Sequence, residues 1–286
     1  QRGCHLLVEK PLAPSGREAA QMCQLARRHQ RLLQVGHVER FNPALLAVES
    51  QLVEPKYIEC RRTSGFSFRS VDIGAVLDLM IHDIDIAIEL AGSDVVEVGA
   101  FGVAMLGRRE DVAQARLRFA NGCLADLYAS RVSSQRTRTM SVMGEHYLAQ
   151  IDFAEHTAQI RRSGHAVTHR GFDAERFSHG ERTEMGPQYF ESLFETEALT
   201  AEPCDAIEAE HSHFFEAIHG RTPLRVDGRA GRQAVEVAEK ILAAMATHEW
   251  DGRPQGRIGP RFESPAPILR PLEWQAGEPG EQRRAG

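Results

Sequence analysis

Asp78 and His82 are the residues whose types and spacing most directly suggest catalysis. Positions four apart on a helix lie on neighbouring turns of one face, so a carboxylate there can orient an imidazole. Oxidation of a secondary alcohol needs a near-neutral base to take the hydroxyl proton while hydride leaves the same carbon. The pair therefore predicts His82 as the base and Asp78 as its partner. The alternative is an amphipathic helix with a solvated acidic face, which explains Asp83, Asp85 and Glu89 better.

Lys10 is the second candidate. It follows the apolar residues from His5 to Val8, which predict a short strand. Open α/β sheets bind their ligands at the carboxyl ends of parallel strands. A lysine at such an end can donate hydrogen bonds to a cofactor ribose or a substrate hydroxyl and stabilise a developing alkoxide. The alternative is a solvated surface lysine.

A third group consists of His37, Arg40 and Asn42, at the expected crossover between two domains, where clefts form. Arg40 is a candidate to hold a carboxylate or phosphate with two hydrogen bonds, and Asn42 to recognise hydroxyls. The alternative for Asn42, which precedes Pro43, is capping and interdomain packing. Arg69, in a loop rich in Ser, Gly and Phe, is a weaker phosphate candidate.

The composition is ordinary for a soluble globular protein and leaves a phosphate-bearing small molecule possible as a ligand. The formal net charge of -6 over 286 residues gives no general attraction to nucleic acid or to an anionic membrane. No apolar run reaches the roughly 18 to 20 residues of a membrane span, and no signal peptide is recognisable. The five cysteines are far apart without a C-x-x-C pair, so we expect no metal site and a cytoplasmic protein.

Residues 1–43 predict a β-α-β unit. Strands near 5–8 and 32–35 flank a helix that begins after Ser15, where Ser15 and Glu18 have the spacing of a capping box. Two strands joined by a helix in this way pair in parallel. The first part of the chain therefore belongs to the α/β class.

Residues 44–250 predict an α+β domain for substrate binding, catalysis and oligomerisation. Apolar residues recur with helical period over about 75–90, and alternate with polar ones around the turn Asn121-Gly122. We expect a mostly antiparallel sheet with helices on one face. Further strands are expected at 57–63, 137–143 and 147–153, and further helices at 43–52, 204–219 and 228–247.

Two segments lack a sustained period. Residues 161–203 are charged with scattered glycine, so we expect a long excursion that can extend over the active site. Residues 251–286 are rich in Pro, Gly and Arg and predict a flexible tail.

A phosphate-binding glycine loop is missing from the sequence. No G-x-G triplet occurs, and the residues that follow Gln1 have a sequence pattern typical of the middle of an α/β domain. We therefore expect residues 1–43 to be the C-terminal remnant of a Rossmann-type parallel sheet. The residue that distinguishes NAD from NADP lies in the absent portion.

Four motifs occur in order along the chain: Glu9-Lys10-Pro11, residues 36–43, Asp78-Leu79-Met80-Ile81-His82, and Phe119-Ala120-Asn121-Gly122 with Ser130-Arg131. With these four motifs in this order, the chain resembles the glucose-fructose oxidoreductase / inositol dehydrogenase / MocA (Gfo/Idh/MocA) family. Among its members, the chain is similar in sequence to those that oxidise the 3-hydroxyl of UDP-N-acetylglucosamine or its uronic acid.

The resemblance implies an NAD(P)-dependent oxidoreductase that acts on a sugar or nucleotide sugar. It places Lys10 and His82 in the catalytic centre and Asp78 against the substrate. The cofactor, NAD or NADP, would lie beside Glu9, Lys10, Pro11 and His37. A homodimer or homotetramer formed through the open face of the second sheet is also implied.

Two other hypotheses remain open. A chain without its cofactor domain can be a non-catalytic binding or oligomerisation protein, which predicts no tight NAD(P) binding. A family reductase acting on an imine or enone would use His82 as an acid, which product analysis would reveal.

Overall fold

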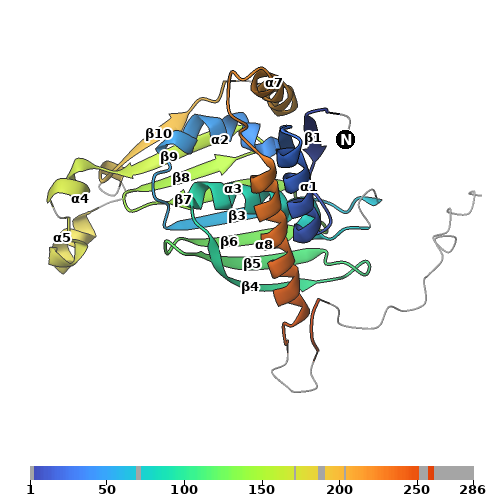
Figure 1. Cartoon of the computed structure of the whole chain (residues 1–286). Helices are drawn as coiled ribbons and strands as arrows, with labels where there is room; N and C mark the ends of the chain where they lie inside the picture. Colours follow the sequence, from blue (N-terminus) through green and yellow to red (C-terminus); the bar gives the residue numbers. More distant parts are fainter. Residues whose placement is uncertain are drawn as a thin grey trace, which may run out of the picture.

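The chain folds around two β-sheets of unequal size (Figure 1). The computed structural model describes residues 3–68, 72–170, 172–185, 191–202, 204–250 and 257–260. Arg69 and all of the expected tail except 257–260 lie outside these ranges.

The small sheet is the predicted β-α-β unit. Strands β1 (Leu6–Glu9) and β2 (Leu33–Gly36) pair in parallel, joined by α1 (Gly16–Arg28). The Ser15 hydroxyl caps α1 by accepting a hydrogen bond from the Glu18 amide at 3.2 Å. The expectation for this part of the chain is confirmed, and β1 delivers Lys10 at its carboxyl end.

The large sheet has eight strands in the order β10-β9-β8-β7-β3-β6-β5-β4. All neighbouring strands are antiparallel except β3 and β6, so the sheet is mostly antiparallel as expected. Its strands are β3 (Tyr57–Thr63), β4 (Val95–Val103), β5 (Val112–Phe119), β6 (Leu124–Ser130), β7 (Thr137–Met143), β8 (Tyr147–Asp152), β9 (Thr157–Ser163) and β10 (Phe194–Leu199).

Helices cover one face of this sheet (Figure 1). They pack on alternate strand residues such as Ala115, Leu117 and Phe119, which are fully buried. Among the described helices, even α8 lacks the apolar length that a membrane crossing requires. The covering elements are η1 (Val38–Phe41), α2 (Pro43–Val48), η2 (Glu49–Gln51), the π-helical turn η4 (Val76–Met80), α3 (Ile81–Ala91) and α8 (Gly228–Ala246).

The last two helices return to the small sheet. Helix α7 (Ala206–Ile218) packs on η1, and α8 packs on α1 and β2 as well as on the large sheet. A Cβ on Gly231 would lie 2.5 Å from Cγ2 of Val35, so glycine is needed for this close approach. The core around β1, α1 and β2 therefore contains residues from both sides of the expected boundary at residue 43.

The expected excursion over 161–203 is wrong in part. It contains the end of β9, the short helices α4 (His165–Arg170), η5 (Ala174–Arg176) and α5 (His179–Glu184), and the edge strand β10. Figure 1 places α4 and α5 beyond the edge of the large sheet, at the opposite end from β1. Edge strands of polar composition carry little periodic signal, which is why β10 was not expected.

Candidate active site

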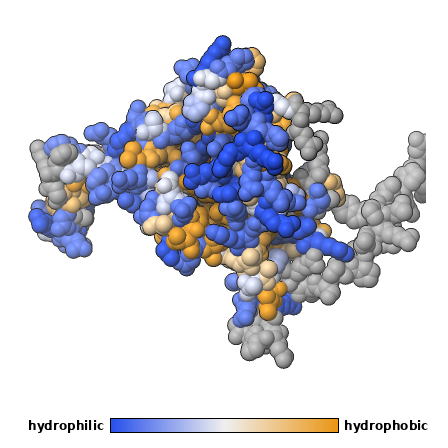
Figure 2. Space-filling view, in the orientation of Figure 1, coloured by the Kyte–Doolittle hydropathy of each residue, from blue (hydrophilic) through white to orange (hydrophobic). Residues whose placement is uncertain are grey.

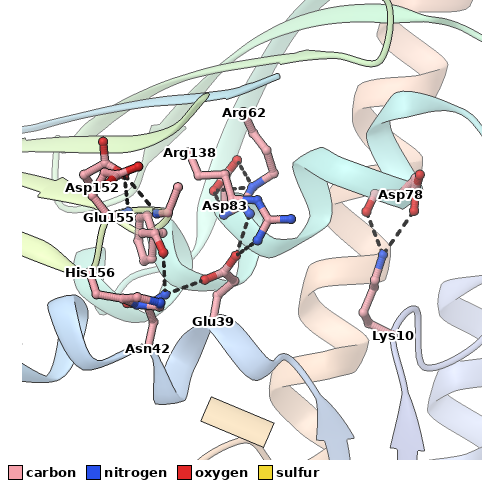
Figure 3. A network of polar contacts seen from close by, with 12 residues as sticks. Lys10, Glu39, Asn42, Arg62, Asp78, Asp83, Arg138, Asp152, Glu155 and His156 are labelled. Atoms are coloured by element: carbon pink, nitrogen blue, oxygen red, sulfur yellow. Dashed lines mark hydrogen bonds and ion pairs between the residues drawn. The ribbon is translucent and has the colours of Figure 1, made fainter. Parts of the chain in front are cut away.

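Lys10 and Asp78 meet where β1 ends against the π-helical turn η4 (Figure 3). The Lys10 ammonium donates to the Asp78 backbone carbonyl at 2.6 Å and lies 3.3 Å from its carboxylate Oδ1. Both side chains are half-buried. The strand and the turn, 68 positions apart in the sequence, are thus joined through a charged pair that still faces solvent.

The beginning of η4 is held by strand β5 and the residues before it. The Val76 amide donates to the buried Glu110 carboxylate at 3.0 Å, and the Ala75 amide donates to the Glu110 carbonyl at 2.9 Å. Arg131 joins this support by donating to the Ile73 carbonyl at 2.6 Å. Turns of π-type are rare and frequently occur at functional sites. No pattern in the sequence distinguished this one from an α-helix.

His82 lies one turn further along, with its ring facing that of His37. The ring centroids are 6.1 Å apart and the planes are nearly perpendicular, at 88°. His82 Nδ1 is buried and has no hydrogen-bond partner among the described residues. Burial, followed by the charges of Arg62 and Lys10, holds the pKa of His82 well below its usual range. The imidazole is therefore neutral at pH 7 and able to accept a proton.

The expected partnership of Asp78 with His82 is corrected by this geometry. The Asp78 carboxylate is engaged with Lys10, and His82 Nδ1 is left without a partner in the described part of the chain. Spacing of i, i+4 allows two side chains to meet but does not compel it. A lysine delivered by a distant strand competes for the carboxylate, and the charged partner wins.

His37 closes the site from the end of β2. The residue is only 1% exposed, yet neither ring nitrogen has a partner in the described structure. Burial lowers the pKa of His37, with the charge of Asp85 opposing that shift. Buried polar atoms are nearly always hydrogen-bonded in native proteins. The unpaired nitrogens of His37 and His82, close to Lys10, fit a polar ligand such as a nicotinamide cofactor.

Glu9 and Pro11 flank Lys10 on the same segment. A Cβ on Gly36 would lie 3.0 Å from Glu9 Oε2, so the glycine lets the Glu9 carboxylate rest on β2. Glu9 is exposed and Pro11 is half-buried. Both are therefore accessible beside the carboxyl ends of the two parallel strands.

Arg40 is corrected from a substrate ligand to a structural residue. Its side chain is only 3% exposed. Its guanidinium donates to the Arg225 carbonyl at 3.2 Å, contacts Glu89 at 3.1 Å and lies 3.8 Å from Asp85. A guanidinium with these partners is not free to bind a carboxylate or phosphate.

Asn42 is likewise a structural residue, as its alternative interpretation held. Its side-chain oxygen caps α2 by accepting from the Ala44 amide at 3.1 Å. Its amide nitrogen donates to Glu39 and to the Phe153 carbonyl, each at 3.0 Å. The side chain is buried and joins η1, α2 and the turn after β8, so it does not recognise substrate hydroxyls.

The acidic face expected for α3 is wrong for Asp83 and Asp85, which are buried, whereas Glu89 is 61% exposed as expected. Asp83 and Asp85 are each 3% exposed. Asp83 receives hydrogen bonds from Arg62, at 2.7 Å from Nη2 to Oδ1, and Arg62 Nη1 donates to Glu39 at 2.7 Å (Figure 3). Although burial opposes it, these carboxylates raise the pKa of Arg62. The signal available in the sequence was alternation in β3, which places Arg62 on the same face as Ile58 and Cys60.

Glu210 of α7 is a further residue that the sequence did not single out. It is 2% exposed, and its Oε1 has no partner among the described residues. Burial, and then the charge of Glu9, raise the pKa of Glu210 to about 7. The helix thus places a carboxyl group of near-neutral pKa close to the segment that carries Lys10.

Comparison with known proteins identifies the family. Residues 1–37 match an oxidoreductase family with an NAD-binding Rossmann fold, and residues 45–149 match the GFO/IDH/MocA C-terminal domain. The chain is 32% identical to the UDP-N-acetylglucosamine 3-dehydrogenase of Acidithiobacillus ferrooxidans over 86% of its own length and 72% of that protein. The chain belongs to the Gfo/Idh/MocA oxidoreductase family.

Solved structures of similar proteins agree with this Gfo/Idh/MocA assignment. The crystal structure of the Acidithiobacillus ferrooxidans enzyme superposes with a TM-score of 0.71 at 31% identity, covering 84% of this chain and 70% of that one. A levoglucosan dehydrogenase bound to NADH and levoglucosan superposes at 0.66 over 85% and 71% of the two chains. At 18% identity, the latter supports the fold alone. The predicted fold class, family and nicotinamide cofactor class are thereby confirmed.

Proposed function

We propose that this Gfo/Idh/MocA protein oxidises a secondary hydroxyl of a sugar or nucleotide sugar by hydride transfer to NAD or NADP. The observation that carries the proposal is the convergence of Lys10 from β1, His37 from β2 and His82 from α3. Two of these residues hold unpaired buried nitrogens, and the third is a half-buried cation. Alcohol oxidation needs a hydrogen-bond donor for the developing alkoxide and a neutral base for the hydroxyl proton, which Lys10 and His82 supply. His37 adds unpaired ring nitrogens for the cofactor.

Each residue has a distinct part in the reaction. Neutral His82 takes the hydroxyl proton, and the Lys10 ammonium donates to the substrate oxygen as negative charge develops on it. Asp78 holds Lys10 in position through its carbonyl and carboxylate. Glu9, Lys10, Pro11 and His37 would contact the nicotinamide cofactor. When bound, that cofactor supplies the hydride acceptor.

The substrate class rests on similarity to relatives. The relative at 32% identity carries the name UDP-N-acetylglucosamine 3-dehydrogenase. We infer a related nucleotide sugar as substrate for this chain.

The test is NADH or NADPH formation by the full natural protein across a panel of UDP-sugars and free sugars. Wild-type protein is compared with His82→Ala and Lys10→Ala, and with Lys56→Ala as a control at an exposed lysine. We expect turnover with at least one sugar, lost in the first two variants and kept in the third. Activity that survives both active-site substitutions would refute the assignment.

We further propose that copies of this protein assemble through the face of the large sheet opposite the helices. That face carries exposed or half-buried side chains from β3, β5 and β6, such as Arg61, Arg116 and Tyr128. Light scattering on the purified protein tests this, with a dimer or tetramer expected and a monomer contradicting it. Because none of the five cysteines forms a disulfide, we also infer a reducing, cytoplasmic setting.

A further inference from the structure

We propose that a cavity beside the active site binds the diphosphate of a nucleotide sugar through Arg136, Arg138 and His156. The cavity measures about 760 Å³ and lies between η1, the start of β7, the turn after β8 and the beginning of α7. The inference rests on the proposed function, because it names the part of the substrate that would be held next to the catalytic residues.

The guanidinium groups of Arg136 and Arg138 are not fully paired within the described protein, so they can bind a ligand. Arg136 is exposed and makes no ion pair within the described residues. Arg138 approaches Glu39 Oε1 at 3.3 Å through Nη1, but Arg62 occupies the same oxygen at the shorter distance of 2.7 Å (Figure 3). Arg138 is therefore only partly neutralised. Guanidinium groups bind phosphate oxygens with paired hydrogen bonds, so two neighbouring arginines suit a diphosphate.

His156 is a third polar group of the cavity, and its contact with Asn42 fixes which ring nitrogen donates inside the protein. Its Nδ1 lies 3.4 Å from Asn42 Oδ1. That Asn42 atom is the amide oxygen, because the Asn42 nitrogen donates to Glu39 and to the Phe153 carbonyl. An oxygen accepts, so Nδ1 of His156 carries a proton. His156 sits in a left-handed turn with φ 55°, and the exposed ring leaves Nε2 available to the cavity, where it would donate to a phosphate oxygen as the imidazolium that a bound anion favours.

The acidic groups around the cavity are occupied elsewhere. Asp205 caps α7 by accepting from the Ile207 amide at 2.8 Å, and Glu39 is bound to Arg62. Asp152 accepts from the amides of Ala154 and Glu155 within the turn after β8. Each of these carboxylates thus has hydrogen-bond partners of its own, and in the described structure none of them forms an ion pair with Arg136.

The cavity is lined by the sequence neighbours of one catalytic-site residue. Val38 lines it and directly follows His37, whose ring faces His82. Arg138 shares Glu39 Oε1 with Arg62, and Arg62 in turn binds Asp83, the residue next to His82. A sugar joined to a diphosphate in this cavity would therefore extend toward Lys10 and His82.

Calorimetric titration with UDP, inorganic pyrophosphate and uridine tests the inference without requiring turnover. The variants are Arg136→Ala and His156→Asn, since asparagine tolerates the left-handed backbone. Arg118→Ala is the matched control, because it removes an exposed arginine from β5. We expect UDP and pyrophosphate to bind wild type, and each cavity variant to weaken UDP about tenfold. The control should bind as wild type does.

Two results would overturn the inference: uridine binding as tightly as UDP, or UDP binding in both cavity variants equal to that in Arg118→Ala. Failure of the proposed function is recognised separately. If no sugar yields NADH or NADPH while UDP binding still depends on Arg136 and His156, the oxidation is refuted and the diphosphate site stands. If a sugar is oxidised but the cavity variants bind UDP normally, the diphosphate site alone is refuted.

Discussion

The Lys10 ammonium donates to the backbone carbonyl of Asp78 at 2.6 Å while facing the carboxylate of the same residue at 3.3 Å. One residue thus holds the lysine by two different oxygens, one of them part of the main chain. Because the carbonyl contact is independent of the Asp78 side chain, we expect Lys10 to keep its position when the Asp78 carboxylate is replaced. This separates the positioning of Lys10 from the charge of Asp78.

Replacing Lys10 by alanine is expected to reduce kcat/KM by about 10²- to 10³-fold, the usual effect of removing a donor to a developing oxyanion. Asp78→Asn should reduce it less, because the carbonyl contact with Lys10 remains. Steady-state kinetics on the preferred sugar measure both variants. Equal losses in the two would show that the Asp78 carboxylate has its own contact with substrate.

His82→Ala is expected to lower kcat by about 10²- to 10⁴-fold. In the wild type, the depressed pKa of His82 keeps the base unprotonated to a pH below 6.5, so alcohol oxidation should lose rate only below that value. The pH profile of kcat/KM measures this. A rate that falls by half at or above pH 7 on the acid side would contradict the assignment of His82.

Glu210→Gln is expected to stabilise the protein at pH 8 by at most about 3 kcal/mol. Glu210 has a pKa of about 7 in the folded state, against 4.5 ordinarily. Its contribution to stability is present below pH 4.5 and is lost as the pH rises through 7, where a buried charge must form. Urea unfolding of variant and wild type at pH 5 and pH 8 checks the sign. A difference that does not grow with pH would contradict it.

Arg62→Met is expected to cost about 3–5 kcal/mol, since it leaves Asp83 and Glu39 buried without their partner. Equilibrium unfolding measures the loss. The double substitution with Asp83→Leu should recover part of it, because one stranded carboxylate is removed with its partner. Arg116→Met, at an exposed ion pair, is the control, and a comparable loss there would contradict the prediction.

Gly231→Ala is expected to destabilise the protein by about 1–3 kcal/mol, because the new methyl group would lie 2.5 Å from Val35 Cγ2. Helix α8 would have to move away from β2. Gly180→Ala in α5 is the control, as its Cβ would meet nothing within 4 Å. Thermal unfolding measures the Tm of both variants. A Tm of Gly231→Ala equal to that of wild type would contradict the prediction and show that α8 moves without cost.

The surface over the helices exposes several hydrophobic side chains, which affects the solubility of the protein in these experiments. Figure 2 shows this face as largely hydrophilic, with hydrophobic side chains in separate areas, one of them at the top where α7 lies. Ile207 and Phe215 of α7 are each 56% exposed. Such exposed apolar side chains favour association between molecules. We therefore expect samples without detergent to need moderate protein concentrations to avoid aggregation.

The sequence by itself determined the local structure and the identity of the chemical groups. The strands expected at 57–63 and 137–143 agree with β3 and β7 to the residue, and a capping serine located the start of α1. Lys10 was recognised from the strand before it, and Asp78 with His82 from their helical spacing. These signals are local, because they depend on residues within one or two turns or strands.

Only the tertiary structure decided which of these groups are free to act. Asp78 turned to Lys10, and Arg40 and Asn42 were taken by partners up to 185 positions away. Asp83 and Asp85 became buried because the sheet and the surrounding elements enclose α3. The cavity of Arg136, Arg138 and His156 joins segments with no common pattern. Burial and pairing are properties of surfaces that meet in space, and no local period encodes which surfaces will meet.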